Sequence, residues 1–349
     1  MVENFKQAIE GIVHLGRIMC ELAENQLPEN AALSASDHSS FSDDITRARL
    51  VNPWFKEENT RSQLKALGGR LNESELLDWL SRYEIPASKN KTVAIIMAGN
   101  IPLVGFHDVL CALMCGFKVK AKLSSDDPVL LPSLMKIWEH THSVLAKRVE
   151  FVEGKLEDFD AVIATGSNNS ARYFHQYFDS YPHLIRKNRT SVAVLLGDET
   201  EEELKNLGND VFKYFGLGCR NVTKVFIPQD FNLNRLFEAF FDFKEIVDHN
   251  KYANNYDYHK ALWLMNKDEL LDNGFLLVKE EDERLVSPVG SLFTQRYSNI
   301  DELEQLLENR REEIQCVVGK KHVPFGKAQE PALDDYADGV DTVQFLLTV

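Results

Sequence analysis

Apolar runs of strand length alternate with helical stretches from residue 92 onward. The first run, Thr92–Met97, is continuous and ends at a Gly-Asn pair, and Val104–Cys115 after it has the composition of a buried helix. Strands that alternate with helices of roughly 10–15 residues favour a parallel sheet. We therefore predict an α/β fold. The same pattern predicts strands at Phe117–Leu123, Val149–Val152, Asp160–Ala164, Ser191–Leu196 and Thr223–Ile227, and helices at 127–142, Asn168–Phe178, Glu201–Phe215 and Leu233–Val247.

The chain before residue 91 has a different, helical character. Apolar residues recur at helical spacing through residues 3–25, a second helical stretch opens at Asn52, and a third begins at Asn72. Residues 29–46 are rich in Ser, Ala, Asn and Asp without a period, so we predict a loop there. Toward the other end, the pattern predicts strands at Phe275–Val278, Val286–Phe293, Cys316–Val318 and Val343–Leu347, and a helix at Asp301–Leu307.

Composition argues against several classes of protein. The chain has 349 residues with 39 basic and 54 acidic side chains, a net charge of -15, which argues against broad binding to nucleic acid or anionic membranes. No apolar run approaches the ~20 residues of a membrane helix. The first residues lack the pattern of a signal peptide. The five cysteines are scattered without zinc-site spacing, so we expect a cytoplasmic protein with reduced thiols and no metal.

Cys219 is the candidate nucleophile. It lies in the run Gly-Leu-Gly-Cys-Arg-Asn, between a predicted helix and a predicted strand. A thiolate on such a turn can attack a carbonyl carbon, and its peptide N–H can donate to the resulting oxyanion. Asn100, on the turn after the first predicted strand, offers a side-chain amide for the same oxygen. A structural cysteine buried at a helix end has the same spacing, so both interpretations stay open.

Four segments together resemble the aldehyde dehydrogenase superfamily, and within it the LuxC-type acyl-CoA reductase of bacterial bioluminescence systems. Residues 99–102 (Gly-Asn-Ile-Pro) are similar to the family's Trp-Asn-Phe-Pro turn, and residues 215–219 (Phe-Gly-Leu-Gly-Cys) to its Gly-Gln-x-Cys turn. Residues 164–167 (Ala-Thr-Gly-Ser) resemble its Phe-Thr-Gly-Ser turn. Residues 120–128 resemble its Lys-Pro-Ser-Glu-x-x-Pro motif. The resemblance implies two α/β domains, one of them a Rossmann-like cofactor domain, with the cysteine of the second segment as nucleophile and the asparagine of the first as oxyanion donor.

The resemblance also implies a nicotinamide cofactor. Lys122 falls on the family lysine that contacts the adenosine ribose, and Gly166 and Ser167 fall on the turn that faces the pyrophosphate at a helix N-terminus. Ser125 replaces a family glutamate whose charge would repel a 2′-phosphate, which favours NADPH. Glu283, one residue out of register, is the nearest match to the glutamate of Glu-x-Phe-Gly-Pro that contacts the nicotinamide ribose.

One departure from the family pattern bears on the reaction. Hydrolytic members carry a general-base glutamate in Leu-Glu-Leu-Gly-Gly, and Leu195 stands in its place. Without that base, water is poorly activated against a thioester, so an acyl group on the cysteine can await hydride or the CoA thiol. The departure favours an acyl-CoA reductase over an aldehyde-oxidising enzyme.

The resemblance implies a domain organisation as well. A helical region, 1–90, would pack on an NADP-binding domain, 91–191, followed by a catalytic domain, 192–330, that carries the nucleophile. The segment 331–349 would return to the cofactor domain. In the superfamily the last strand commonly crosses to a partner subunit, so we expect Val343–Val349 to be an interface strand of a homo-oligomer.

These inferences predict NADPH-dependent reduction of acyl-CoA, in particular fatty acyl-CoA, to an aldehyde through a thioester on Cys219, with release of CoA. The acyl group would come from acyl-CoA or from an acyl-carrying partner enzyme. Two alternatives remain open. One is a cysteine-dependent acyltransferase or thioesterase that uses no nicotinamide, and the other is a non-catalytic binding subunit.

Overall fold

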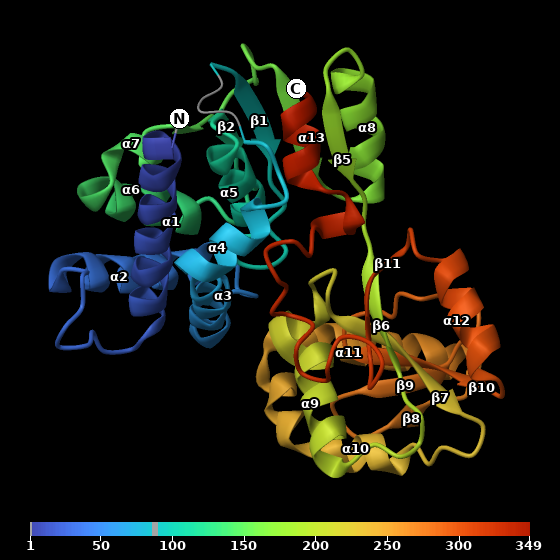
Figure 1. The fold of residues 1–349 in the computed structure, drawn as a ribbon. Coiled ribbons are helices and arrows are strands. Elements are labelled where there is room, and N and C mark those ends of the chain that lie inside the picture. The colour runs from blue at the N-terminus through green and yellow to red at the C-terminus, as the bar shows by residue number, and fades with distance from the viewer. Residues whose placement is uncertain (1, 86–89) are drawn as a thin grey trace. The chain divides into compact units, whose positions relative to one another are not determined.

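Each of two structural units is built around its own β-sheet (Figure 1). The first unit consists of residues 1–187 and 332–349, and the second of residues 188–331. The second unit is therefore inserted into the sequence of the first.

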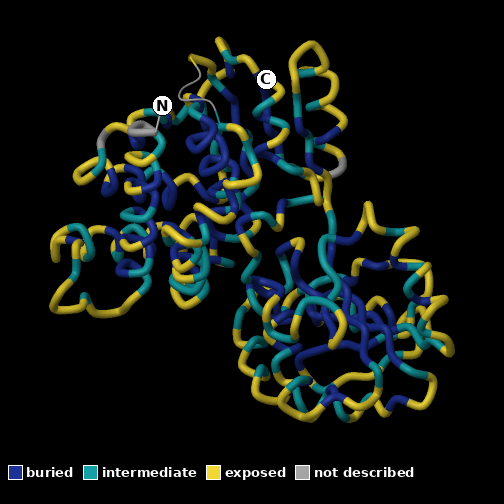
Figure 2. Tube along the Cα trace, viewed as in Figure 1, coloured by how far each residue is buried: buried dark blue, intermediate teal, exposed yellow. Residues whose placement is uncertain are grey.

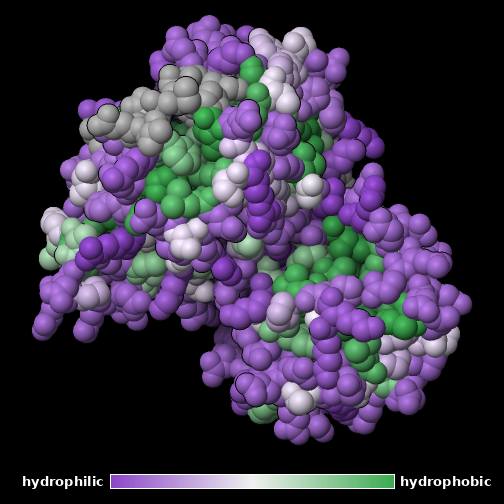
Figure 3. Space-filling view, in the orientation of Figure 1, coloured by the Kyte–Doolittle hydropathy of each residue, from purple (hydrophilic) through white to green (hydrophobic). Residues whose placement is uncertain are grey.

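The computed structural model describes residues 2–85 and 90–349. Met1 and residues 86–89 belong to the predicted helical region and lie outside the described residues. Buried segments follow the strands of both sheets, and exposed segments follow the outer helix faces and the loops (Figure 2). The face drawn in Figure 3 is largely hydrophilic, in keeping with the net charge of -15.

The sheet of the first unit is parallel throughout, in the strand order β3-β2-β1-β4-β5. The chain forms β1, adds β2 and β3 on one side, and then crosses to β4 and β5 on the other. In open parallel sheets this reversal creates a crevice at the carboxyl ends of the central strands, where ligands bind. The predicted parallel α/β arrangement is confirmed. The strands are β1 (Thr92–Ile96), β2 (Lys118–Lys122), β3 (Val149–Phe151), β4 (Ala161–Thr165) and β5 (His183–Arg186).

The N-terminal helices share one hydrophobic core with the helices that follow β1 and β2. Helices α1 and α3 approach closely where Gly16 faces Gly68, because a Cβ added to either glycine would lie 2.8 Å from the other's carbonyl oxygen. Only glycine fits both positions. The helices are α1 (Val2–Ala23), α3 (Glu57–Gly69), α4 (Glu73–Leu80), α5 (Phe106–Met114), α6 (Leu130–Thr141), α7 (Ser143–Ala146) and α8 (Asn168–Phe178).

The predicted loop at 29–46 is wrong, because helix α2 (Ala35–Val51) occupies most of it. Ser34 caps this helix by accepting a hydrogen bond from the Asp37 N–H. Phe41, Ile45 and Ala48 are its buried residues, spaced four and three apart on one face. The helix is stabilised by packing that face on the core, which outweighs the low apolar content of its sequence.

The predicted C-terminal interface strand is also wrong. The segment forms helix α13 (Thr342–Thr348), whose first turn is capped by Asp341 through a 2.8 Å bond from the Gln344 N–H. Val343 and Leu346 are fully buried and belong to the hydrophobic core of the first unit. Burial of these residues on a single helical face decides the conformation, although an apolar run of this length also suits a strand.

The second unit has a six-stranded sheet in the order β11-β6-β7-β10-β9-β8. All its strand pairs are parallel except β8 and β9, which form an antiparallel edge. Its strands are β6 (Thr190–Val194), β7 (Val222–Pro228), β8 (Leu271–Asp272), β9 (Leu277–Glu280), β10 (Ser291–Tyr297) and β11 (Ile314–Val318). Its α-helices are α9 (Glu201–Phe212), α10 (Asn234–Phe240), α11 (Asn250–Asn266) and α12 (Ile300–Asn309).

Candidate functional site

In the first unit, the turn after β1 carries Asn100 at the surface. The preceding Gly99 is buried, and a Cβ there would lie 2.8 Å from the Ser124 side chain. The Gly99 carbonyl accepts a hydrogen bond from the Asn52 Nδ2 at 3.2 Å. Glycine is therefore required for this turn to pack against the turn after β2, and the packing places the asparagine at the carboxyl edge of the sheet.

Asp127 holds the turn after β1 in place through a hydrogen bond. Its Oδ2 accepts a hydrogen bond from the N–H of Leu103 at 2.9 Å, and Leu103 has a left-handed backbone with a φ of 59°. Burial raises the pKa of Asp127 to about 6, against the opposing effect of two backbone hydrogen bonds. The residue thus joins the Gly-Asn-Ile-Pro segment to the lysine-containing segment of residues 120–128.

Lys122 ends strand β2, and its Nζ donates to the carbonyl of Gly154 at 2.6 Å. Lys120, two residues earlier on the same face, donates to the carbonyl of Glu157 at 2.7 Å. Ser125 follows on an exposed turn. Two ammonium groups are therefore held at this edge of the sheet, and the residue in the position of the family glutamate carries no charge.

The turn after β4 leads directly into α8. Ser167 is the N-cap of that helix and accepts a hydrogen bond from the Ser170 N–H at 3.1 Å. A Cβ at Gly166 would lie 3.0 Å from the Phe174 and Ser170 side chains, so the turn is tightly packed. The N-terminus of an α-helix favours anions through its unpaired N–H groups and its dipole.

In the second unit, Cys219 is exposed on the turn between α9 and β7. Helix α9 ends at Phe212, and Tyr214 and Phe215 then adopt left-handed backbones with φ of 52° and 59°. A left-handed conformation costs roughly 1–2 kcal/mol for each residue that has a side chain. Both aromatic side chains are buried, so packing holds this strained turn in place.

Hydrogen bonds anchor the backbone of Cys219 and the side chain of the residue after it. Its carbonyl accepts a hydrogen bond from the Ser191 Oγ at 3.0 Å. The neighbouring Arg220 is 9% exposed, and its Nη1 donates to the carbonyl of Ala328 at 3.4 Å. The backbone at this position is therefore anchored on two sides, while the cysteine itself reaches the surface. An interpretation of Cys219 as a buried structural cysteine does not agree with its exposure.

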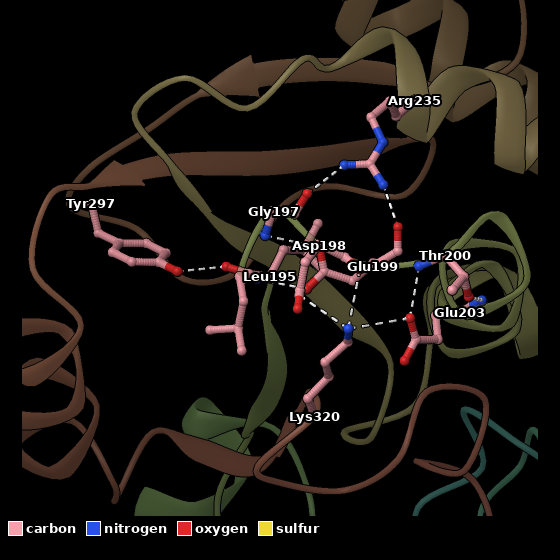
Figure 4. A network of polar contacts seen from close by, with 10 residues as sticks. Leu195, Gly197, Asp198, Glu199, Thr200, Glu203, Arg235, Tyr297 and Lys320 are labelled. Atoms are coloured by element: carbon pink, nitrogen blue, oxygen red, sulfur yellow. Dashed lines mark hydrogen bonds and ion pairs between the residues drawn. The ribbon is translucent and has the colours of Figure 1, made fainter.

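Leu195, in the position of the family's general base, is fully buried just beyond the end of β6 (Figure 4). Its carbonyl accepts a hydrogen bond from the Tyr297 hydroxyl at 2.6 Å. The nearby carboxylate of Glu199 is buried and accepts hydrogen bonds from the N–H groups of Leu196 and Gly197 at 2.6 and 3.0 Å. Both oxygens of this carboxylate therefore accept hydrogen bonds from the backbone of the turn.

A lysine and an arginine also contact this turn (Figure 4). Lys320 lies 3.0 Å from an Asp198 carboxylate oxygen and 3.6 Å from Glu203, and Arg235 donates to the Gly197 carbonyl at 2.8 Å. The hydrogen bond and the charge of Lys320 lower the pKa of Asp198. The turn is therefore held as a rigid element with no carboxylate at position 195.

Glu283 is exposed on the loop between β9 and β10. Its N–H donates to Glu281 Oε1 at 3.1 Å, and its carbonyl accepts from Arg310 Nη1 at 2.7 Å. Both of these hydrogen bonds use the backbone of Glu283.

The structure brings together the candidate residues of each unit separately. In the first unit, Asn100, Lys122, Ser125, Gly166 and Ser167 follow the adjacent strands β1, β2 and β4 at one edge of the sheet. In the second unit, the cysteine turn leads into β7, which pairs with β6.

Within residues 2–85 and 90–349, no group of His, Cys, Asp and Glu side chains is arranged to hold a metal ion. In the same residues, no helix has both the length and the apolar character needed to span a bilayer.

Solved aldehyde dehydrogenases have a similar fold. The indole-3-acetaldehyde dehydrogenase of P. syringae, solved with NAD+ and IAA, superposes with a TM-score of 0.61 at 13% identity, over 90% of this chain and 71% of that one. The NAD-dependent benzaldehyde dehydrogenase of Corynebacterium glutamicum gives a TM-score of 0.60 at 13% identity, over 89% and 76% of the two chains. The chain has an aldehyde dehydrogenase-like fold.

A third structure extends the comparison. Aldehyde dehydrogenase C of Pseudomonas syringae, solved with NAD+ and octanal, gives a TM-score of 0.57 at 14% identity, over 85% of this chain and 69% of that one. No protein-family model matches the sequence. No curated protein matches it either. At these identities the likeness concerns the fold.

Asn221, Asp210 and Glu199 are structural parts of the site that the sequence analysis missed. Each is polar and buried, and each bonds to backbone groups rather than to a recognisable motif partner. A polar residue directly after the cysteine turn was the one available signal for Asn221, and it was too general to single the residue out.

Proposed function

We propose that this protein is an NADPH-dependent acyl-CoA reductase of the LuxC type that acts on fatty acyl groups. The observation that carries the proposal is an exposed cysteine on an anchored, strained turn in an aldehyde dehydrogenase-like fold, combined with a buried leucine at position 195. The first supplies a nucleophile, and the second leaves the expected water-activating position without a carboxylate.

The reaction begins with attack of the Cys219 thiolate on the thioester carbonyl carbon. The carbonyl oxygen becomes an oxyanion, which the Cys219 N–H stabilises by a hydrogen bond, an effect worth roughly 3 kcal/mol for each donor. We assign Asn100 to the same role by its sequence motif alone. The oxyanion then collapses, the bond to the CoA sulfur breaks, and CoA leaves as a thiolate that takes up a proton. The acyl group remains on the cysteine as a thioester.

Bound NADPH supplies a hydride for the second half of the reaction. When the thioester carbonyl carbon accepts it, the bond between that carbon and the cysteine sulfur breaks and the aldehyde is released. The cysteine returns to the thiolate form. The overall change consumes one acyl-CoA, one NADPH and one proton, and it yields one aldehyde, one CoA and one NADP+.

The residues of the first unit suit NADPH. The tight turn at Gly166 and the helix N-terminus at Ser167 suit a pyrophosphate, because backbone N–H groups there favour anions. Lys120 and Lys122 place positive charge at the same edge of the sheet, and Ser125 lacks the charge that would repel a 2′-phosphate. We assign Glu283 to the nicotinamide ribose by sequence position alone.

Hydrolysis of the acyl-enzyme should be slow, because the buried Leu195 side chain cannot remove a proton from water. The same feature allows transfer of the acyl group to a thiol. A cysteine-dependent acyltransferase is therefore the second candidate, and it differs from the reductase in needing no nicotinamide. We further propose a cytoplasmic location, since all five cysteines are free of disulfide bonds, and we propose a homo-oligomer from the resemblance to the superfamily alone.

Intact-mass measurement tests the function. Incubation with acyl-CoAs of several chain lengths should add one acyl group to the wild-type protein, and NADPH should then remove it with release of aldehyde. The Cys219→Ala variant should lose both the mass gain and NADPH consumption while its circular dichroism spectrum stays unchanged.

Cys20→Ala is the matched control, because it removes a half-buried thiol of the first unit whose pKa is raised by burial. It should behave as wild type. Near-normal NADPH consumption by Cys219→Ala with acyl-CoA would rule out the proposed nucleophile. Acyl turnover that proceeds without any cofactor would favour the acyltransferase.

A further inference from the structure

Asn221 lies two residues after Cys219 and is completely buried. Its Oδ1 accepts a hydrogen bond from the N–H of Gly218 at 2.8 Å, and its own N–H donates to the Gly218 carbonyl at 3.0 Å. Asn221 therefore bonds to both backbone groups of the residue that directly precedes the cysteine. Cys219 thus lies within a short loop, residues 218–221, whose two ends are joined by these hydrogen bonds.

The other end of the same amide faces the last turn of helix α9. The Nδ2 donates to the carbonyls of Lys213 at 2.7 Å and Asp210 at 3.1 Å, and it lies 3.4 Å from that of Val211. Carbonyls at a helix end have no partners within the helix. Asn221 satisfies them in the place where Tyr214 and Phe215 turn the chain away with left-handed backbones.

Asp210 extends this network to a third segment. Its carboxylate accepts hydrogen bonds from the N–H of Gly326 at 2.6 Å and from that of Ala328 at 3.0 Å. Arg220 reaches the Ala328 carbonyl from the cysteine turn. The end of α9, the cysteine turn and residues 326–328 are thus joined through two buried side chains.

We propose that Asn221 is a positioning residue for Cys219, which it holds in the orientation needed for attack on the acyl carbonyl. An asparagine suits this task because it donates to the helix carbonyls and accepts from the Gly218 N–H at once. The positioning of Cys219 by Asn221 depends on the proposed function only because that function names the substrate as an acyl-CoA. The effect on the reactivity of the thiol itself does not depend on it.

The test compares wild type with Asn221→Ser, whose shorter side chain cannot bridge the helix end and the turn. Without the amide, the α9 carbonyls turn their negative ends toward the cysteine loop without compensation, and this raises the pKa of the thiol. Alkylation of Cys219 by iodoacetamide, located by peptide mass mapping and measured against pH without cofactor, should therefore move its midpoint upward by about one pH unit.

Steady-state kinetics give the second readout. Misplacement of a nucleophile lowers the rate of the chemical step, so kcat for acyl-CoA reduction should fall roughly 10- to 100-fold while KM for acyl-CoA changes little. The matched control is Tyr256→Phe, which removes a part-buried hydrogen bond to Asp272 elsewhere in the second unit. It should leave both readouts at wild-type values.

The two readouts separate failure of this inference from failure of the proposed function. If acyl-CoA does not react with wild type, the function fails, yet the alkylation profile still tests the positioning role. A folded Asn221→Ser protein with an unchanged alkylation midpoint would overturn the proposal, as would a change in KM alone. If that variant does not fold, the isosteric Asn221→Asp, which keeps the acceptor and loses the donors, replaces it and is judged by kcat and KM, because its added carboxylate would itself raise the pKa of the thiol.

Discussion

The fold raises the pKa of Asp210, a buried residue next to the cysteine turn. Its burial in the second unit raises its pKa from 3.8 to about 6, although two backbone N–H groups favour the charged form. The folded protein therefore binds this proton more tightly than the unfolded chain does. The contribution to stability is largest below the ordinary pKa and is lost as the pH rises through about 6.

Asp210→Asn should remove this dependence, because an amide does not titrate. The free energy of unfolding of wild type, measured by urea denaturation relative to the variant, should decrease by about 3 kcal/mol between roughly pH 4 and pH 7. A constant difference between the two proteins across this range would contradict the assignment. Asp127, the other buried aspartate with a pKa near 6, is common to both proteins and cancels in the comparison.

Ser125 determines the choice between NADPH and NADH in our proposal. Ser125→Glu should weaken NADPH binding by roughly tenfold or more, because the added carboxylate repels the 2′-phosphate, while NADH binding changes less. Fluorescence titration with both cofactors measures the effect. Ser125→Gln is the control of the same size without the charge, and equal losses in both variants would point to bulk rather than repulsion.

Short motifs at strand ends predicted the candidate residues Asn100, Ser167 and Cys219, because a turn beside a strand leaves a local trace in the sequence. The buried polar residues behind the cysteine turn left no specific trace. Asn221 and Asp210 act through backbone carbonyls and N–H groups of residues that are distant in the chain, and any sequence can supply those groups. Their partners become visible only when the fold brings the segments together.

At the scale of elements, a buried ion pair ties helix α13 to the first unit. Arg186, at the end of β5, forms an ion pair with Asp108 of α5 and donates to the Thr342 hydroxyl of α13 at 2.8 Å. Both charged groups are almost completely buried. A buried charge that loses its partner is strongly destabilising.

Asp108→Asn should therefore lower the free energy of unfolding of the first unit by about 3–5 kcal/mol, as measured by chemical denaturation. The double variant Asp108→Leu with Arg186→Met should recover most of this loss, since it leaves no unpaired charge. If the single variant were as stable as wild type, the pair would not hold α13 in the way the structure indicates.

Helices and strands with a clear apolar spacing in the sequence were predicted well. Elements whose conformation depends on tertiary packing were not. Helix Asn168–Phe178 and strands β1 to β4 of the first sheet follow directly from their apolar spacing, whereas the short strand β5 was not predicted. Helix α2 has its buried side chains diluted among polar residues, and α11 has large apolar residues on several faces, so neither shows a simple period. The terminal segment suits two conformations, and contact with the core selects the helix.

At the scale of the whole molecule, each unit has its own hydrophobic core. We expect two calorimetric transitions on heating. NADPH should shift mainly the transition of the first unit, because all the proposed cofactor residues except Glu283 lie at its sheet edge, and the stabilisation should reach about 2.7 kcal/mol at a hundredfold excess over Kd. Asp108→Asn identifies that transition by lowering it. A cofactor shift confined to the other transition would contradict the assignment.

The insertion of residues 188–331 into the first unit has a consequence for biosynthesis. Helix α13 contributes buried residues to a core most of whose other members emerge from the ribosome long before it. The inserted unit, which is continuous in sequence, can fold as soon as it has emerged. The earlier-made part of the first unit must wait with an uncovered apolar surface, which makes it the natural client of a chaperone on the nascent chain.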